Sequence, residues 1–331
     1  MTLLGDRVLE IIEPGLLLTI QDGGRPGLAR EGVTRGGAAD RFSLEVANAL
    51  VANAPDAAAL EATLLGPTVR ALRPVTLGLA GTMAARVLET GLPVEPGATV
   101  TLHEGETLEL QAATAARAYI ALPGGIDVAL VLGSRSTSLA TGFGGLDGRA
   151  LRAGDALSIG GDPVVPRAQW PGAASPAPVT RELPLRVLPG PNAAERGPEL
   201  HALVATTWTV SPTSDRMGIR LDGPPLDGPP LPEVASHGVV AGTVQLPPDR
   251  RPIVLLADHQ PTGGYPVIGV VISADLPRLG QLAPGATVAF ATTAPRDARA
   301  ALASDVEARE AAHAHLRDAT RWDELWREAG A

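Results

Sequence analysis

Polar side chains beside glycines form four clusters in this chain of 331 residues, and these clusters contain the residue types that chemistry needs. Each cluster flanks a short apolar stretch, which is the usual setting of loop residues that bind or react. Together they supply carboxylate, hydroxyl, amide and guanidinium groups, a set suited to oxygen-rich anions and to acid–base chemistry. The clusters lie at residues 19–40, 133–149, 211–218 and 258–266.

The first two clusters are suited to binding an anion. In the first, a strand expected over 15–20 runs through Gln21 into a glycine loop with a carboxylate and a guanidinium group, Asp22 and Arg25. Such a loop can hold an anion against its backbone N–H groups. The second cluster supplies the side chains of Arg135, Ser136 and Thr137. The alternatives are a hairpin turn with a surface ion pair and a mobile loop. Neither cluster matches a P-loop, a dinucleotide-binding fingerprint or a nucleophile elbow.

The other two clusters combine carboxylates with hydroxyl and amide groups. In the third, Ser214 and Asp215 are typical caps of a turn, whereas Asp215 with Arg216 would equally position a substrate. The fourth follows the apolar strand 253–257, so the end of that strand presents polar groups at the rim of a barrel. A turn alone does not need the set found there: Asp258, Gln260, Thr262, Gly263, Gly264 and Tyr265.

The composition excludes several classes of chemistry. The chain has no cysteine, which removes disulfides, thiolate nucleophiles and iron–sulfur clusters. All 27 basic residues are arginine, so the chain can carry neither a lysine Schiff base with pyridoxal phosphate nor a covalent biotin. The net charge of −9 argues against nucleic-acid and anionic-membrane partners. His313 and His315 point apart on a helix, so we expect no metal site.

The chain shows no targeting segment. Charged residues at Asp6, Arg7 and Glu10 interrupt the apolar stretch that a signal peptide would need. The longest apolar runs have the length of a strand, far below the ~20 residues of a membrane span. We therefore expect a soluble, cytoplasmic protein.

Glycine and proline punctuate short apolar runs, so strands and tight turns are expected to dominate. The chain has 38 Gly and 31 Pro. Short apolar, β-branched runs predict strands, among them 75–79, 99–102, 107–110, 118–122, 253–256 and 267–272. Helices are expected over 42–51, 195–204 and 296–328. Trp322 and Trp326, one helical turn apart, are expected to dock the last helix onto the body.

The two halves of the chain look related. The pentapeptide Pro-Gly-Ala-Thr-Val occurs at 96–100 and again at 284–288, and strand, Gly-Gly, strand, turn and strand follow in the same order in both halves. This order predicts two copies of a β-barrel unit, although turn chemistry alone can reuse such a pentapeptide. We expect an N-terminal β-barrel domain, a proline-rich linker, a C-terminal barrel and a helical extension, at 1–165, 166–184, 185–294 and 295–331.

Long segments in a fixed order resemble one known family: TIQDGGRPG (19–27), EATLLGP (61–67), LGSRST (132–137), SDRMGIRL (214–221), GTVQLP (242–247) and DHQPTGGYP (258–266). The chain resembles the KipA-like proteins related to allophanate hydrolase subunit 2, the biotin-dependent carboxyltransferase subdomains A and B, a family that includes the C subunit of 5-oxoprolinase. The resemblance implies a mainly β fold with two cyclophilin-like β-barrel domains, a few short helices and a C-terminal helix. It also implies a KipI-like partner, the B subunit, and a TIM-barrel-like A subunit. Pro261 and Val267 stand where the family usually has Thr and Lys, so arginines would have to replace that lysine.

The resemblance leaves three functions open. The first is ATP-dependent opening of 5-oxoproline to glutamate by a hetero-oligomer, with ATP and Mg bound in the assembly and this chain inactive alone. Arg25, Arg135 and Arg216 would then hold phosphate or carboxylate, while Asp258 or Asp215 would serve as acid or base. The second is a carboxyltransferase half acting on urea, with biotin on another chain. The third is a non-catalytic regulator of a kinase inhibitor.

Overall fold

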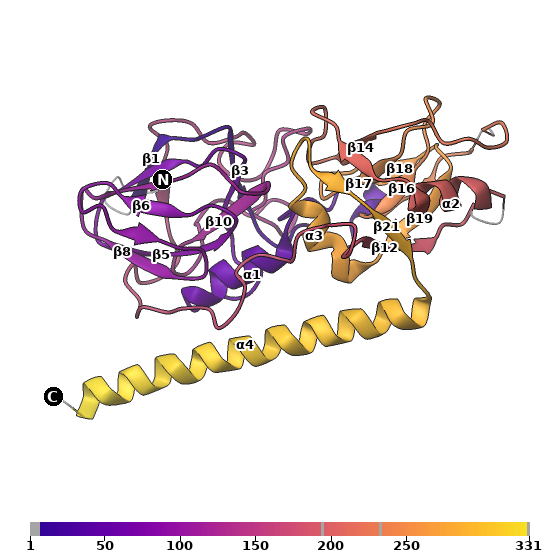
Figure 1. Ribbon diagram of the computed structural model, residues 1–331. Coiled ribbons are helices and arrows are strands. Elements are labelled where there is room, and N and C mark those ends of the chain that lie inside the picture. Colours follow the sequence, from indigo (N-terminus) through magenta and orange to yellow (C-terminus); the bar gives the residue numbers. More distant parts are fainter. Residues whose placement is uncertain (1–6, 193–194, 232–233, 330–331) are drawn as a thin grey trace. The chain divides into compact units, whose positions relative to one another are not determined.

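The computed structural model describes residues 7–192, 195–231 and 234–329, with side chains described as far as Leu316. The chain divides into two compact units (Figure 1). Unit 1 takes Met1–Gly24, Arg41–Pro176 and Glu307–Ala331, and unit 2 takes Arg25–Asp40 and Ala177–Val306. Neither unit is one continuous stretch, because the segment 25–40 joins the second unit. The boundaries expected from the sequence, 1–165 and 185–294, stay a prediction.

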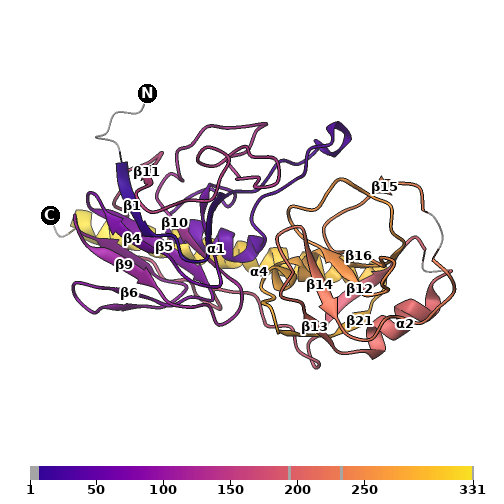
Figure 2. The same ribbon diagram turned by 90° about the horizontal axis from the view of Figure 1, so that it is seen from above.

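Unit 1 consists of two antiparallel sheets. One has the strand order β11-β1-β4-β9-β6-β7, that is Ala156–Ser158, Arg7–Glu13, Thr68–Ala71, Thr107–Leu110, Ala85–Val87 and Pro93–Val94. Several of these strands lie side by side in Figure 2. The other has the order β2-β3-β10-β5-β8, that is Leu17–Gln21, Ala59–Thr63, Arg117–Ala121, Val75–Gly81 and Thr99–Leu102. Both sheets contribute to one apolar core that includes Ile11, Ile20, Leu60, Leu77 and Ile120.

Alternation along the second sheet leaves a polar face opposite that core. Leu60 and Ala62 of β3 point into the core, so Glu61 between them points to the other face. Helix α1 (Arg41–Leu50) packs against β5 and β10. A Cβ on Gly78 would lie 2.6 Å from the carbonyl oxygen of Ala47, so only glycine lets the helix approach this closely.

Unit 2 contains an eight-stranded sheet that nearly closes on itself. Its order is β20-β13-β14-β17-β16-β19-β12-β21, that is Thr287–Val288, Trp208–Val210, Gly218–Asp222, Ile253–Leu255, Thr243–Gln245, Val267–Val271, Leu185–Pro189 and Phe290–Thr292. The two end strands, β20 and β21, are separated by one residue, Ala289. The segment 287–292 therefore pairs with β13 through β20 and with β12 through β21. Because this one segment supplies both end strands of the order, the sheet curls into a barrel. Its core surrounds Trp208, whose Nε1 donates to the Leu203 carbonyl at 3.0 Å.

Shorter elements complete unit 2. A two-stranded ribbon joins β15 (His237–Gly238) to β18 (Thr262–Gly263). Helices α2 (Gly197–Ala205) and α3 (Leu276–Gly280) and the 3₁₀ turns at Ala29–Glu31 and Ser273–Asp275 lie outside the sheet. Helix α4 runs from Pro295 to Ala329. Among the helices described, none has the long apolar stretch that crossing a bilayer takes.

The structure confirms the mainly β fold, with barrel sheets, short helices and a C-terminal helix. The expected helices correspond to α1, α2 and α4, and the expected strands are found within one or two residues. The repeated pentapeptide has one local structure in both places: Gly97 and Gly285 have φ of +92° and +82°, and each is followed by an edge strand, β8 or β20. The expected docking of Trp322 and Trp326 lies outside the described side chains.

Helix α3 holds the segment 25–40 against unit 2, and Gly280 makes this possible. A Cβ on Gly280 would lie 2.2 Å from the Ala39 carbonyl oxygen. We predict that Gly280→Ala lowers the free energy of unfolding by about 2 kcal/mol, because backbone has to move. Urea denaturation measures it. The matched control is Gly197→Ala at the start of α2, where a Cβ meets nothing within 4 Å. Equal stability of the two variants would contradict this packing.

Candidate functional site

The Asp22 carboxylate joins the first two polar clusters inside unit 1. Its Oδ1 accepts hydrogen bonds from Gly24 N at 2.7 Å, Ser134 Oγ at 2.6 Å and Ser136 Oγ at 2.5 Å. Its Oδ2 accepts one from the Arg135 backbone N–H at 2.5 Å. Asp22 and both serines are buried. The predicted binding residues Asp22 and Ser136 therefore bind each other, and the carboxylate organises the loop 133–137.

Gln21 and Thr137 extend this junction. Gln21 Nε2 donates to Thr19 Oγ1 at 3.0 Å and to the Thr137 carbonyl at 3.2 Å. Thr137 in turn donates from N and from Oγ1 to the Ile20 carbonyl. The Thr137 carbonyl fixes the orientation of the amide, because rotating the amide would place two oxygens together. Gln21 Oε1 is thereby left buried and without a hydrogen-bond partner.

The guanidinium of Arg135 lies on the outside of this junction. Arg135 Nε donates to the Val128 carbonyl at 2.9 Å, and Nη2 lies 3.4 Å from Asp127 Oδ1. About a third of the side chain is exposed. In the segment 134–137 the guanidinium of Arg135 thus reaches solvent, while the hydroxyls of Ser134, Ser136 and Thr137 are used inside the fold.

A buried acid on the polar face of β3 was missed by the sequence reasoning. Tyr119 Oη donates to Glu61 Oε2 at 2.6 Å, and Arg117 Nε lies 3.5 Å from Glu61 Oε1. All three side chains are almost fully buried. The signal was present, since a glutamate in the middle of an apolar strand has to be compensated by partners. Glu61 is the first residue of the EATLLGP segment.

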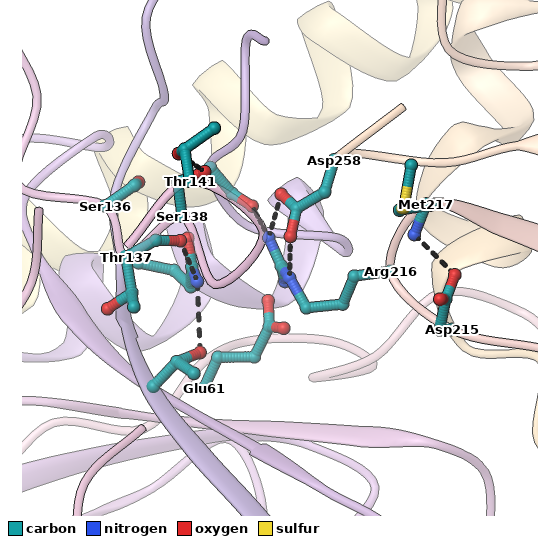
Figure 3. A network of polar contacts seen from close by, with 12 residues as sticks. Glu61, Ser136, Thr137, Ser138, Thr141, Asp215, Arg216, Met217 and Asp258 are labelled. Carbon is teal, nitrogen blue, oxygen red and sulfur yellow. Dashed lines mark hydrogen bonds and ion pairs between the residues drawn. The ribbon is translucent and has the colours of Figure 1, made fainter. Parts of the chain in front are cut away.

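Two arginines and a carboxylate come together in unit 2 from three distant parts of the sequence. Arg216 donates from Nε to Asp258 Oδ2 at 2.8 Å and from Nη2 to Asp258 Oδ1 at 2.9 Å, a bidentate pair (Figure 3). Arg216 Nη2 also donates to the Gly37 carbonyl at 2.6 Å. A Cβ on Gly36 would lie 3.6 Å from Arg25 Nη1 and 3.7 Å from Asp258 Oδ1. Arg25, Arg216 and Asp258 are all buried.

Backbone hydrogen bonds hold the third and fourth clusters together. Leu256 N donates to the Met217 carbonyl at 3.0 Å, and Asp258 N donates to the Arg216 carbonyl at 2.9 Å. These bonds continue the pairing of β14 with β17 beyond the strand ends. The side chains of Arg216 and Asp258 are therefore positioned by the sheet, which makes their geometry precise.

Asp215 has the capping role that the sequence allowed as an alternative, whereas Ser214 bonds the backbone of Arg220. Asp215 Oδ1 accepts from the backbone N–H groups of Met217 at 2.8 Å and Gly218 at 3.2 Å. Ser214 Oγ accepts from Arg220 N at 3.0 Å. Asp215 is exposed. This arrangement is an Asx turn that shapes the loop before β14.

The remaining residues of the fourth cluster line a rim and a pocket of unit 2. Thr262 and Gly263 form β18. A Cβ on Gly263 would lie 2.3 Å from Gln245 Nε2, so a larger residue here would displace the Gln245 side chain. Tyr265, 43% exposed, lines a pocket of about 660 Å³ together with Leu231, Val234, Leu246, Pro248, Arg250, Gly264 and Pro266. Gln260 lies at the loop between Asp258 and β18, half-buried.

His259 is a second residue that the sequence reasoning passed over. Its Nδ1 lies 2.7 Å from the Gln260 carbonyl oxygen. A carbonyl oxygen only accepts, so Nδ1 carries the proton. Burial lowers the pKa of His259, and the hydrogen bond to Gln260 and the charge of Asp258 oppose that shift in part. The signal in the sequence was a histidine directly after Asp258 at the end of a buried strand.

The described side chains include no group of three His, Asp or Glu residues placed to hold a metal ion. The site residues thus fall into two sets. In unit 1, Gln21, Asp22, Ser136 and Thr137 join two loops. In unit 2, Arg25, Arg216 and Asp258 form a buried charged group beside His259. Such a group can orient an anion and take up or release a proton.

The sequence is similar to one protein family and to several known proteins. The family model described as "Carboxyltransferase domain, subdomain A and B" matches residues 31–292. The C subunit of 5-oxoprolinase from Escherichia coli (strain K12) is 38% identical over 296 residues, which cover 86% of this chain and 90% of that protein. The urea amidolyase of Lachancea kluyveri is 31% identical over 306 residues, 85% of this chain and 17% of that protein.

The crystal structure of TTHA0988 superposes on 86% of this chain with a TM-score of 0.77 and 36% identity. The match takes up 56% of the TTHA0988 chain. This chain therefore spans about half the length of that solved relative, but nearly the whole length of the E. coli protein.

The hydrogen bonds that Asp22 accepts predict that its negative charge stabilises the fold. We expect Asp22→Asn to lower the free energy of unfolding by about 3 kcal/mol, because the amide turns one acceptor into a donor facing donors. Thermal or urea denaturation measures the change. The control is Asp127→Asn, an exposed carboxylate beside Arg135, with an expected change within about 0.5 kcal/mol. A neutral Asp22→Asn would show that the carboxylate serves something other than the fold.

The lowered pKa of His259 predicts a loss of stability in acid. A histidine whose pKa is lower in the folded state keeps its full contribution above about pH 6.5, its ordinary pKa, and loses it as the pH falls below that value. Relative to wild type, His259→Gln should lose less thermal stability between pH 7.5 and pH 5.5. His103→Gln, at an exposed position, is the control and should follow wild type. An unchanged pH dependence in His259→Gln would contradict the lowered pKa.

Proposed function

This chain belongs to the family of carboxyltransferase domains, subdomains A and B, and from this we propose that it is the C subunit of an ATP-dependent 5-oxoprolinase. The reaction opens the lactam ring of 5-oxoproline to give glutamate. The observation that supports the proposal most is the 38% identity to the C subunit of a 5-oxoprolinase, over 90% of that protein's length. A cytoplasmic location goes with the proposal, because ATP is a substrate.

The chemistry explains why arginines are needed. A lactam carbonyl is a poor electrophile, and transfer of the γ-phosphoryl group of ATP to its oxygen makes the ring carbon open to attack by water. Phosphate and carboxylate oxygens are held best by guanidinium groups. In this proposal Arg216 and Arg25 hold these oxygens in unit 2, and the partly exposed Arg135 offers a separate guanidinium in unit 1. Since both oxygens of Asp258 contact Arg216, Asp258 acts by orienting that guanidinium.

ATP would bring Mg²⁺ with it. Because the described residues offer no cluster of three metal ligands, no step of the proposal runs through a metal held by this chain. The nucleotide pocket is assigned to the assembled enzyme as a whole.

The proposal includes partners. We infer that a KipI-like B subunit and a TIM-barrel-like A subunit complete the enzyme, and that this chain is inactive alone. The length of TTHA0988 supports this, since a solved relative carries the equivalent of this chain as 56% of a longer polypeptide.

A carboxyltransferase acting on urea is the second candidate. The 31% identity to a urea amidolyase favours it. Biotin would have to come from another chain, because this one has no lysine. The matched region is 17% of that protein, so most of the amidolyase has no counterpart here.

The test is reconstitution with both partners. We expect ATP hydrolysis to rise when 5-oxoproline is added, with one glutamate formed for each phosphate released. No lactam-dependent hydrolysis in the full assembly would overturn the proposal. Carboxylation of urea, with a carboxybiotin donor added to this chain and its partner, would instead establish the second candidate.

The bidentate pair predicts that lysine cannot replace Arg216. Lysine keeps the charge but cannot make two parallel hydrogen bonds. We expect Arg216→Lys to lower kcat for lactam-dependent phosphate release by about 100-fold, the size of effect seen when one charge-stabilising donor is lost. Arg70→Lys is the control, since its pair with Glu10 is largely exposed, and its activity should stay within about twofold of wild type. Comparable losses in both variants would contradict the role of Arg216.

A further inference from the structure

The two carboxylates of the third and fourth clusters, Asp215 and Asp258, are engaged by other groups. Both oxygens of Asp258 accept from Arg216. Asp215 caps a turn through the N–H groups of Met217 and Gly218 and is exposed. A carboxylate whose two oxygens both accept from one guanidinium serves to position that guanidinium. The third and fourth clusters therefore leave one other group that can accept a proton near neutral pH, the imidazole of His259.

The ring of His259 is fixed in one tautomer. Its Nδ1–H donates to the Gln260 carbonyl at 2.7 Å, which leaves the lone pair on Nε2. Within the described chain Nε2 has no hydrogen-bond partner, and it is not among the polar atoms that the fold seals from solvent. The residue is 8% exposed. The backbone is fixed as well, since His259 N donates to the Leu256 carbonyl at 3.2 Å. A held ring with one reachable lone pair is the arrangement that a general base needs.

The surroundings of the His259 ring act on its pKa in opposite directions. Asp258 is on the same loop and favours the protonated form. Arg216, from the loop before β14, binds Asp258 and offsets its charge. Arg25 Nη1 and Asp258 Oδ1 both lie within 4 Å of a Cβ placed on Gly36. Burial acts against protonation and outweighs the attraction of Asp258, so the pKa of His259 is lowered. At pH 7 the lone pair on Nε2 is therefore available.

We propose that Nε2 of His259 is the general base that activates water in the lactam-opening reaction. In the step, an O–H bond of water breaks and its proton goes to Nε2, while the oxygen forms a bond to the phosphorylated ring carbon. The proton then passes from Nε2 to the ring nitrogen, which returns the imidazole to its starting form. The ring C–N bond then breaks, and the hydroxyl on the former ring carbon becomes the carbonyl of an acyl phosphate. The proton of that hydroxyl goes to the nitrogen that has left the carbon, which becomes the amine. A second water hydrolyses the acyl phosphate to carboxylate and phosphate. This inference rests on the proposed function.

The position of His259 supports this role. It directly follows Asp258, whose partner Arg216 is the guanidinium that the proposal gives to phosphoryl oxygens. The loop that carries it continues through Gln260 to Tyr265, which lines the pocket of unit 2. The base and the anion-holding group are thus carried by neighbouring loops anchored to the sheet.

The test is the pH dependence of kcat/KM for lactam-dependent phosphate release by the full assembly. Wild type should lose activity in acid as Nε2 becomes protonated. His259→Gln should lower kcat by 100-fold or more, in line with the usual contribution of about 10²–10⁴-fold from general bases, and should lose the acid limb while KM for 5-oxoproline stays unchanged. His103→Gln is the control. Wild-type kcat or an unchanged acid limb in His259→Gln would overturn the inference.

Two further measurements separate the outcomes. If His259→Gln does not fold, His259→Ala with added imidazole replaces it, and recovery of activity by imidazole supports the base, whereas no recovery in a folded variant contradicts it. NMR of the chain with ¹⁵N-labelled histidine reports the tautomer without any assay, and a proton on Nε2 at neutral pH would overturn the inference. If the wild-type assembly shows no lactam-dependent turnover, the proposed function itself fails, whatever the NMR spectrum shows.

Discussion

The buried pair of Arg216 and Asp258 is the constraint that organises unit 2. Removing two charges from water costs several kcal/mol per ion, and only a well-made set of hydrogen bonds offsets that cost. The pair meets this demand with two parallel contacts and a third from Arg216 to the Gly37 carbonyl. That third contact requires the segment 25–40 to belong to unit 2, although the strands on both sides of it in the sequence belong to unit 1. One ion pair therefore unites residues from three of the four polar clusters.

Unit 1 compensates its buried carboxylates differently. Asp22 is surrounded by neutral donors from two loops, whereas Glu61 takes a tyrosine hydroxyl and a loosely aligned arginine. Neutral donors to a carboxylate fix a loop without bringing a second charge into the interior. The conspicuous motif around Asp22 thus serves local architecture. Gln21 Oε1, in contrast, is a buried acceptor without a partner.

Local patterns predicted most of the secondary structure but little of the site. Alternating apolar runs between glycines and prolines located the strands, and the repeated pentapeptide identified two edge strands with the same left-handed glycine. Sequence spacing could not place 25–40 with unit 2, because that placement depends on Gly280 allowing backbone contact at Ala39. It also could not tell that Asp215 caps a turn while Asp258 binds Arg216. Both aspartates precede or follow short strands, and only the partners found in three dimensions distinguish them.

Composition then limits the chemistry more than any single motif. A chain without cysteine or lysine has carboxylates and six histidines as its bases near neutral pH, because arginine stays protonated. Where a carboxylate accepts two hydrogen bonds from a buried arginine, as Asp258 does from Arg216, its oxygens serve to orient the guanidinium. In the proposed reaction, proton transfer then falls to a neutral group beside this ion pair. In unit 2 that group is an imidazole that burial keeps neutral and a backbone carbonyl keeps oriented.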